Sequence, residues 1–237
     1  MKAFITWVID YKGIQMFNPF KKVELKTIIK DKTIITKDEY EKLLEVVNYE
    51  NGFVEYGAGK RTNMYFDWLV PAFRLGLETG CRREELVTMK WNNLIELEKG
   101  KFIIVLDNLK VNRILVGKDE GEKTKSIPVT HGLMQLLIEL GFDEKMDSDE
   151  YILSRPAELT DSYVMRNISR AFSHFIKLTT DKPLNFKNLR KTYITMLVMK
   201  LGDKAKLFTG HSDDEVLANH YISSAWVAGG LTDFSVF

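Results

Sequence analysis

The sequence has few of the features that mark several common protein classes. It carries one cysteine, Cys81, in 237 residues, so no internal disulfide can form and a reducing cytoplasmic setting is expected. Four scattered histidines and one thiol make no ligand cluster, so we expect no metal site. No apolar run approaches the roughly 20 residues that cross a bilayer, and residues 1–10 lack the cleavage site of a secretory signal. A disulfide-stapled secreted domain, a zinc module and a membrane protein are therefore not expected.

Charge is balanced in total but distributed unevenly. The chain has 34 lysines and arginines against 33 acidic residues, giving a net charge of +1. Composition alone therefore does not indicate a nucleic-acid partner. Residues 1–30 are rich in lysine, whereas acidic residues concentrate in residues 143–150. The hydrophobic fraction of 45% is typical of a globular domain with a buried core.

The chain divides into a short leading segment and one main domain. Residues 1–34 contain a helical stretch, a turn signal at Asn18 and Pro19, and a lysine-rich extended stretch. The main domain begins at a capping box formed by Thr36 and Glu39, in which each side chain bonds the other's exposed backbone amide. We expect a tail and connector over 1–34 and a single domain over 35–237.

Hydrophobic periodicity predicts a mainly α domain with one small antiparallel β-sheet, an α+β fold. Gly80 is a favoured residue just after a helix end. Within the helix that ends there, Pro71 marks an expected kink. Runs of β-branched residues separated by turns predict three strands. The expected helices cover residues 62–79, 83–91, 133–140, 161–178, 186–201 and 213–221, and the expected strands cover 102–106, 111–116 and 126–129.

The first candidate functional segment is residues 79–86. Gly80 permits a sharp turn, which places Arg82 at a helix junction with Glu85 one turn later. A guanidinium held there can present a planar fork to a phosphate while the carboxylate steadies it. The alternative is a surface ion pair worth a few tenths of a kcal/mol.

The second candidate segment is residues 186–192. Lys187 and Arg190 stand at i and i+3, so they project from one helical face. Two like charges so placed repel each other unless an anion lies between them or the face is fully solvated. Leu189 and Tyr193 indicate a largely buried helix, which favours a cationic edge that points into a cleft.

The third candidate segment contains His211 and Tyr221. Ser212 and Glu215 form another capping box, which places His211 just before a helix and Tyr221 near its end. Taken alone, the histidine is typical of a structural residue and the tyrosine of a core or interface residue.

Taken together, the segments resemble the tyrosine recombinase and phage integrase family. Residues 79–86 resemble the family's first arginine box, residues 187–190 its His-x-x-Arg box, and Gly210 with His211 its Gly-His motif. Tyr221 resembles the nucleophile that follows. The resemblance covers residues 36–221 in the family's order. It also offers a β-hairpin lysine, for which Lys118 is the first candidate and Lys123 the rival, because the turn is longer than usual.

The resemblance implies a role for each residue. Arg82 and Arg190 would hold the two nonbridging oxygens of a phosphodiester. Tyr221 would attack the phosphorus and form a 3′-phosphotyrosyl link. Lys118 would protonate the leaving 5′ oxygen, and His211 would hydrogen-bond the phosphate. No metal or other cofactor is implied, because the cations supply the charge that a metal would otherwise provide.

The sequence departs from the family pattern in three ways. Lys187 stands where the family most often has histidine, so it would act either as a base or as a phosphate ligand. One extra residue between His211 and Tyr221 would rotate the nucleophile by about 100° on a continuous helix. Residues 1–34 resemble only a remnant of the family's core-binding domain and its connector, which leaves 35–237 as the catalytic domain and C-terminal tail.

The resemblance implies double-stranded DNA as the partner of a bacterial or phage-encoded protein that acts on mobile DNA. It implies a homotetramer on synapsed DNA, with a monomer expected in isolation and no membrane association. Residues 226–237 would pack on their own domain or dock on a neighbouring protomer. Three alternatives stay open: a catalytically silent DNA-binding relative, a type IB topoisomerase-like enzyme, and a helical interaction domain with coincidental motifs.

Overall fold

The computed structural model describes residues 1–23, 33–116, 121–201, 204 and 208. The chain forms two compact units, Met1–Lys32 and Thr33–Phe237. The first unit contains α1 (Lys2–Lys12), which ends at Gly13 in a left-handed conformation. No residue of α1 is buried, and the rings of Trp7 and Tyr11 stack on its exposed surface with centroids 5.0 Å apart.

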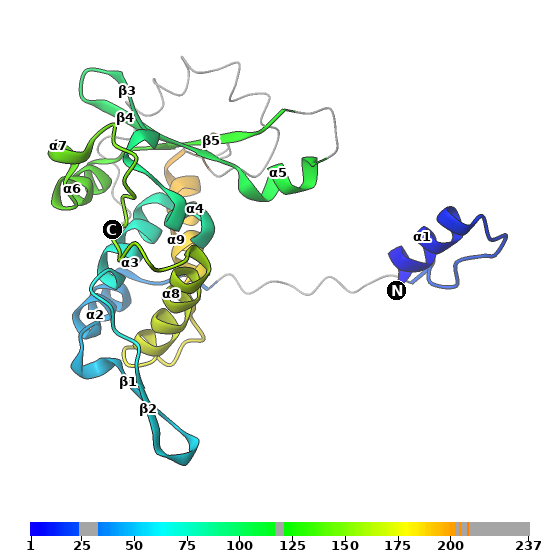
Figure 1. The fold of residues 1–237 in the computed structure, drawn as a ribbon, viewed down its shortest axis with the longest axis horizontal. Coiled ribbons are helices and arrows are strands. Elements are labelled where there is room, and N and C mark those ends of the chain that lie inside the picture. Colours follow the sequence, from blue (N-terminus) through cyan, green and yellow to red (C-terminus); the bar gives the residue numbers. More distant parts are fainter. Residues whose placement is uncertain (24–32, 117–120, 202–203, 205–207, 209–237) are drawn as a thin grey trace. The chain divides into compact units, whose positions relative to one another are not determined.

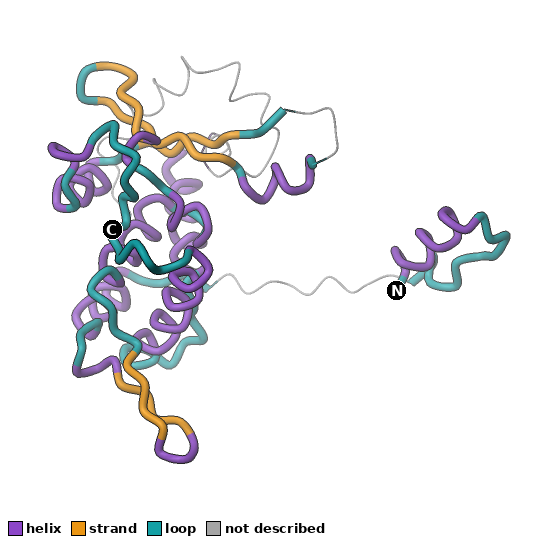
Figure 2. Tube along the Cα trace, viewed as in Figure 1, coloured by secondary structure: helices purple, strands orange, loops and turns teal. Residues whose placement is uncertain are grey.

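The second unit is mainly helical, with small antiparallel sheets (Figures 1 and 2), which confirms the expected fold class. Its described helices are α2 (Lys37–Val46), α3 (Leu69–Thr79), α4 (Arg83–Thr88), α5 (Leu109–Leu115), α6 (His131–Glu139), α7 (Phe142–Lys145), α8 (Asp161–Ile176) and α9 (Lys187–Leu201). The described strands are β1 (Phe53–Tyr56), β2 (Lys60–Asn63), β3 (Leu94–Glu98), β4 (Lys101–Asp107) and β5 (Thr124–Pro128). β1 pairs with β2, and the order in the larger sheet is β3-β4-β5.

The core forms around α3, which packs against α6, α8 and α9. Phe73 on α3 meets Phe172 on α8 edge to face, and Phe172 does the same with Phe186, just before α9. All three rings are buried, so apolar burial and ring geometry together fix the relative placement of these helices. This packing brings the end of α3 and the start of α9 side by side.

Helix boundaries follow the sequence signals where a cap is present. Thr36 and Glu39 form the expected capping box at the start of α2, and Thr160 caps α8 by accepting a hydrogen bond from the amide of Tyr163. Leu43 on α2 is fully buried. Local capping chemistry therefore predicts the starts of these helices well.

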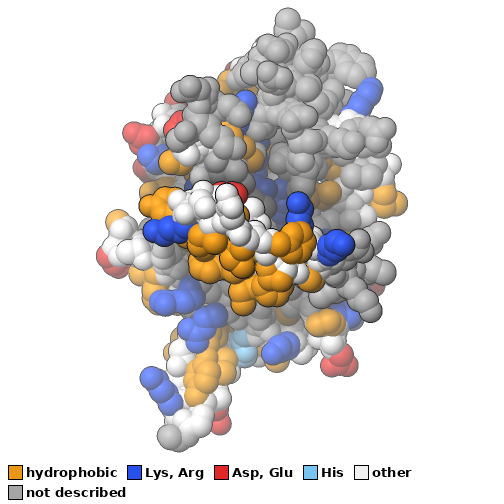
Figure 3. All heavy atoms as spheres, turned by 90° about the vertical axis from the view of Figure 1, so that its right-hand side faces the viewer, with side chains coloured by type: hydrophobic (Ala, Val, Ile, Leu, Met, Phe, Trp, Pro, Cys, Tyr) orange, Lys and Arg blue, Asp and Glu red, His pale blue; other side chains and the backbone are white. Residues whose placement is uncertain are grey.

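The helix expected over residues 62–79 begins later than its periodicity suggests. Residues 53–63 form the β1–β2 hairpin instead, and α3 begins only at Leu69. Pro71 lies in the first turn of α3, where its missing N–H has no helical partner to lose, so no kink is needed. In Figure 3 the hairpin projects at the lower end of the molecule with basic and hydrophobic side chains together; Arg61 lies over the ring of Phe53.

The expected strand over residues 111–116 is wrong, because this stretch is the helix α5. The expected strands do not include β3, which precedes a tight turn at Gly100 and forms one edge of the sheet. The β-branched residues of 111–116 favour a strand locally, but Asn108 begins a helical turn there, and its carbonyl accepts a hydrogen bond from the amide of Asn112. α5 follows β4 and precedes β5 in the sequence, and the two strands pair directly with each other in the sheet.

The remaining helices differ from expectation mainly in length. The helix expected over 83–91 ends at Thr88, and a short 3-10 turn, Trp91–Asn93, follows. The expected helix over 213–221 and the tail over 226–237 lie outside the described residues. No helix in the described part of the chain is both long and apolar enough to cross a bilayer.

Candidate functional site

The site is built on the junction between α3 and α4. Gly80 ends α3 with φ 57°, a left-handed conformation that side chains with a Cβ rarely adopt. A Cβ placed there would also lie 2.2 Å from Cδ1 of Tyr193 on α9. Glycine is therefore needed twice, for the turn and for the close approach of α9. The turn carries the chain directly to Arg82, the N-cap residue of α4.

Arg82 is fixed by Glu85, as its spacing suggested. The backbone amide of Arg82 donates to Oε2 of Glu85 at 2.8 Å, and its guanidinium donates to Oε1 at 2.7 Å. A longer contact of 3.5 Å joins the same guanidinium to the side-chain oxygen of Asn108. Glu85 is only 1% exposed, so the pair is not the surface ion pair of the alternative interpretation.

Glu85 is held in turn by a buried lysine from the sheet. Lys125 on β5 is 2% exposed, and its ammonium donates to Glu85 and to Sγ of Cys81. Burial raises the pKa of the Glu85 carboxyl, but Lys125 and the hydrogen bonds from Arg82 lower it by more, so the net pKa is lowered. A charged carboxylate is thereby kept between two cations.

α9 brings the second arginine to the same place. The guanidinium of Arg190 donates to the carbonyl of Gly80 at 2.5 Å, so the two candidate segments are in direct contact. Burial and the nearby charge of Arg82 lower the pKa of Arg190. Two guanidiniums are thus held close enough to repel, an arrangement that an anion between them would relieve.

The two segments line one pocket of about 490 Å³. Five cationic side chains and one carboxylate contribute to its wall, so its potential is positive and suits an anionic ligand. α8 and the apolar part of α9 complete the wall. The lining residues are Cys81, Arg82, Arg83, Glu84, Met165, Phe186, Lys187, Arg190, Lys191 and Ile194.

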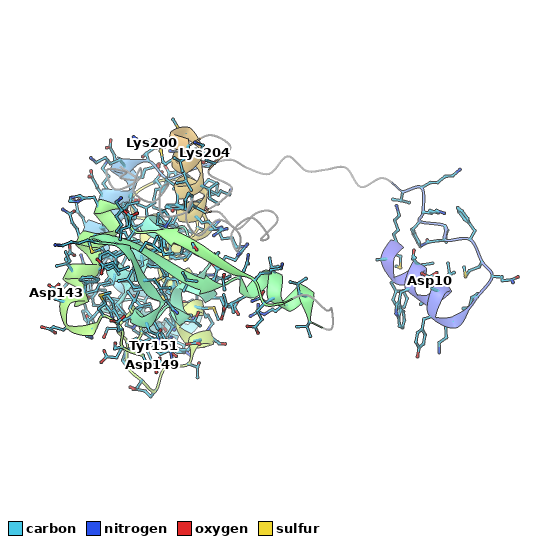
Figure 4. All side chains as sticks on the ribbon, turned by 90° about the horizontal axis from the view of Figure 1, so that it is seen from above. Asp10, Asp143, Asp149, Tyr151, Lys200 and Lys204 are labelled. Atoms are coloured by element: carbon cyan, nitrogen blue, oxygen red, sulfur yellow. The ribbon has the colours of Figure 1, made fainter. Side chains whose placement is uncertain are left out.

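The acidic segment lies away from the end of α9. Figure 4 shows Asp149 and Tyr151 on the opposite side of the second unit from Lys200, and Asp143 at its left edge. Asp149 lies 3.4 Å from the ammonium of Lys90 in a local ion pair. Asp149 is therefore paired locally, and neither Asp143 nor Asp149 lines the cationic pocket.

The structure accounts for three of the residues singled out from the sequence. Arg82, Lys187 and Arg190 line the same pocket. The other three, Lys118, His211 and Tyr221, lie outside the described residues.

Sequence reasoning missed four further residues of this neighbourhood. Arg83 and Lys191 directly follow the two predicted arginines, and that doubling of charge was the available signal. Lys125 and Asn108 come from the sheet and its connection to α5, and no local pattern points to either residue.

The fold and the pocket define a class of protein. The structure is similar to that of lambda integrase bound to DNA, with a TM-score of 0.59 over 90% of this chain and 19% identity. It is also similar to the Tn1549 transposon integrase in complex with circular intermediate DNA, with a TM-score of 0.55 over 93% of this chain and 19% identity. At this level of identity the likeness establishes the fold, which is that of tyrosine recombinase catalytic domains.

The family follows from the sequence. The model of the phage integrase family matches residues 33–226, so the chain belongs to that family. This membership supports a role in site-specific recombination. The chain spans 68% of the lambda integrase and 71% of the Tn1549 integrase in those structures. It spans 56% of the integrase chain in a lambda integrase tetramer bound to a Holliday junction, where the TM-score is 0.58 and the identity 18%. A search of curated proteins finds no match to the sequence.

Proposed function

We propose that this chain cleaves and rejoins DNA strands through a 3′-phosphotyrosyl intermediate in site-specific recombination of mobile DNA. The observation that carries the proposal is that Arg82 and Arg190, far apart in the sequence, line one cationic pocket together with Lys187. Guanidiniums fixed before the substrate arrives stabilise developing charge without reorganising during the reaction. Family membership supports the same reaction class.

The proposed chemistry uses only side chains of the protein. Arg82 and Arg190 bind the nonbridging oxygens of the scissile phosphate, and His211 and Lys187 add hydrogen bonds to them. The phenolic oxygen of Tyr221 attacks the phosphorus, and its proton passes to solvent.

The bond from phosphorus to the 5′ oxygen breaks as the bond from Tyr221 forms. The departing oxygen takes a proton from a lysine of the β4–β5 connection, either Lys118 or Lys123. The new phosphotyrosyl bond keeps the energy of the phosphodiester, so the reverse attack by a 5′-hydroxyl rejoins the strand without a nucleotide or metal cofactor.

Double-stranded DNA is the proposed partner, with a tetramer assembled on two sites. The lambda integrase whose fold this chain shares has been seen as a tetramer on a Holliday junction. Residues 1–34 are proposed to be the end of a core-binding domain and its connector. Since such a domain would supply much of the phosphate contact, we expect this chain alone to bind DNA weakly and with strong salt dependence.

The test is covalent capture. The protein is incubated with a pool of nicked duplex oligonucleotides of random sequence, in which a cleaved end diffuses away, and the adduct is measured on a denaturing gel. We expect an adduct with the wild-type protein and none with Tyr221→Phe. Absence of any wild-type adduct would favour the silent DNA-binding relative, for which Lys187 in place of histidine is the supporting observation. Relaxation of supercoiled plasmid without exchange between sites would favour the topoisomerase-like reading.

A further inference from the structure

The connection between β4 and β5 holds a feature that family membership does not explain. The paired ladder of the two strands ends at Asp107 and Thr124. The backbone continues beyond that point into α5, which Figure 1 shows at the far end of the two strands. One residue past the ladder, the amide of Asn108 donates to the carbonyl of Lys123 at 2.8 Å. Lys123 therefore lies one residue before β5 and is held to the residue that follows β4, just outside the paired strands.

The side chain of Asn112 completes this tie. Its Oδ1 accepts from the amide of Lys123 at 2.8 Å, and its Nδ2 donates to the carbonyl of Lys123 at 3.1 Å. One side-chain amide thus satisfies both peptide groups of Lys123, as a further strand residue would. This asparagine clamp holds the backbone of Lys123 where the ladder no longer can.

The clamp is connected to α4, the helix with Arg82 at its N-cap. Arg113, the next residue on α5, forms a two-bond ion pair with Glu84 on α4, and Glu84 lines the pocket. Asn108, at the start of α5, contacts the guanidinium of Arg82. α5 therefore ties the position of Lys123 to the helix that carries the first arginine.

The ammonium of Lys123 has a freedom that other lysines of the sheet lack. Lys101 is paired with Glu98 at 2.8 Å, and Lys125 is buried against Glu85. Lys123 is half-buried, and among the described residues no carboxylate or other partner binds its ammonium. A proton donor needs this combination, a fixed backbone and an ammonium free to reach the leaving group.

We infer that Asn112 is a positioning residue that fixes Lys123 as the lysine of the proposed reaction. This inference rests on the proposed function and selects Lys123 over Lys118. As the bond between phosphorus and the 5′ oxygen breaks, the ammonium of Lys123 gives its proton to that oxygen and becomes a neutral amine, which regains a proton from solvent. α5 acts in this step only through its hold on the lysine.

The experiment compares two leaving groups. The random duplex pool is made with either oxygen or sulfur at the bridging 5′ position of one fixed phosphate beside the nick, and only the adduct that forms at this phosphate is timed. A thiolate is a much weaker base than an alkoxide and leaves without a proton, so the sulfur pool does not need the lysine. Adduct formation is timed for the wild type, Lys123→Ala, Asn112→Ala and Asn112→Asp. The matched control is Asn92→Ala, which removes an asparagine bonded to Asp149 on the surface.

We expect Lys123→Ala to slow cleavage of the oxygen pool by roughly 10²- to 10⁴-fold and Asn112→Ala by about 10- to 100-fold. Both should cleave the sulfur pool at close to the wild-type rate. Asn112→Asp should resemble Asn112→Ala, because a carboxylate can accept from the amide of Lys123 but repels its carbonyl. Amide hydrogen exchange at Lys123 should quicken in both Asn112 variants and stay unchanged in Asn92→Ala.

Several outcomes would overturn the inference. Asn112 variants that cleave oxygen DNA at the wild-type rate would do so, as would variants equally slow on both pools, which would mark a general loss of structure. Lys123→Ala at full activity would return the role to Lys118. A wild-type protein that forms no adduct with either pool would overturn the proposed function itself, and the inference with it.

Discussion

The two sides of the pocket are built differently. On the buried side, Arg82 is bonded to Glu85, Glu85 to Lys125, and Arg190 to the carbonyl of Gly80. On the open side, Lys187 is exposed at the first position of α9, and its ammonium has no partner among the described residues. The buried side supplies geometry, because fixed donors need not reorganise, whereas the open side supplies charge.

This difference predicts a large stability effect on the buried side. Glu85→Ala would leave the buried ammonium of Lys125 without its carboxylate, and breaking such a pair costs about 3–5 kcal/mol of the free energy of unfolding. Urea unfolding measures it. Glu84→Ala is the matched control: its ion pair with Arg113 is largely exposed, so a loss of less than about 1 kcal/mol is expected. Equal losses at the two neighbours would contradict the account.

The turn at Gly80 should respond nearly as strongly. Gly80→Ala combines a strained left-handed backbone, about 1–3 kcal/mol, with a clash against the buried ring of Tyr193. We expect a loss of about 2–5 kcal/mol in thermal or urea unfolding. Gly59→Ala has φ 72° but open space around the added Cβ, so it isolates the backbone strain. A Gly80 variant no less stable than the Gly59 variant would show that α9 does not need this close approach.

Acidification should weaken the buried side before the open one. The folded pKa of Glu85 is lowered from its ordinary value of 4.5, so its contribution to stability is complete above that pH and is lost as the pH falls through the folded pKa. Urea midpoints measured from pH 6 down to pH 2 should therefore drop less steeply in Glu85→Gln than in the wild type. Parallel curves for the two proteins would rule out the carboxylate as the source of this acid sensitivity.

The smallest effect is expected on the open side. Lys187→Ala should change the free energy of unfolding by no more than about 0.5 kcal/mol, because the side chain is solvated. DNA affinity, followed by fluorescence anisotropy over a series of salt concentrations, should lose about one unit of slope on a log-log plot. A large loss of stability would place Lys187 on the buried side instead.

The sequence predicts those parts of the site that depend on neighbours along the chain. The spacing of Arg82 and Glu85 on a helix start, and of Lys187 and Arg190 on one face, needs only helical geometry. Lys125 could not be found this way, since its partner comes from a different element and the pairing depends on how the sheet meets α4. The same holds for Asn112, whose partner Lys123 is brought back by the pairing of β4 with β5.

The fold shows the same limit. Capping at Thr36 and the glycine end at Gly80 predict boundaries correctly, because both are local. Residues 111–116 include the β-branched Val111, Ile114 and Val116, which favour a strand, yet the amide of Asn112 bonds the carbonyl of Asn108 in a helical turn. Residues 53–63 carried a hairpin signal in Gly57 and Gly59 between short β-favouring runs, which the helical pattern of the following segment concealed.

The most direct test of the account is whether Arg82 and Arg190 share one anion. Sulfate is titrated into isotope-labelled protein, and the side-chain Nε–H resonances of both arginines are followed by NMR. We predict that the two resonances shift together with one dissociation constant, and that Arg82→Ala abolishes the shift at Arg190. Separate dissociation constants, or a shift at Arg190 that persists in Arg82→Ala, would contradict a shared phosphate site.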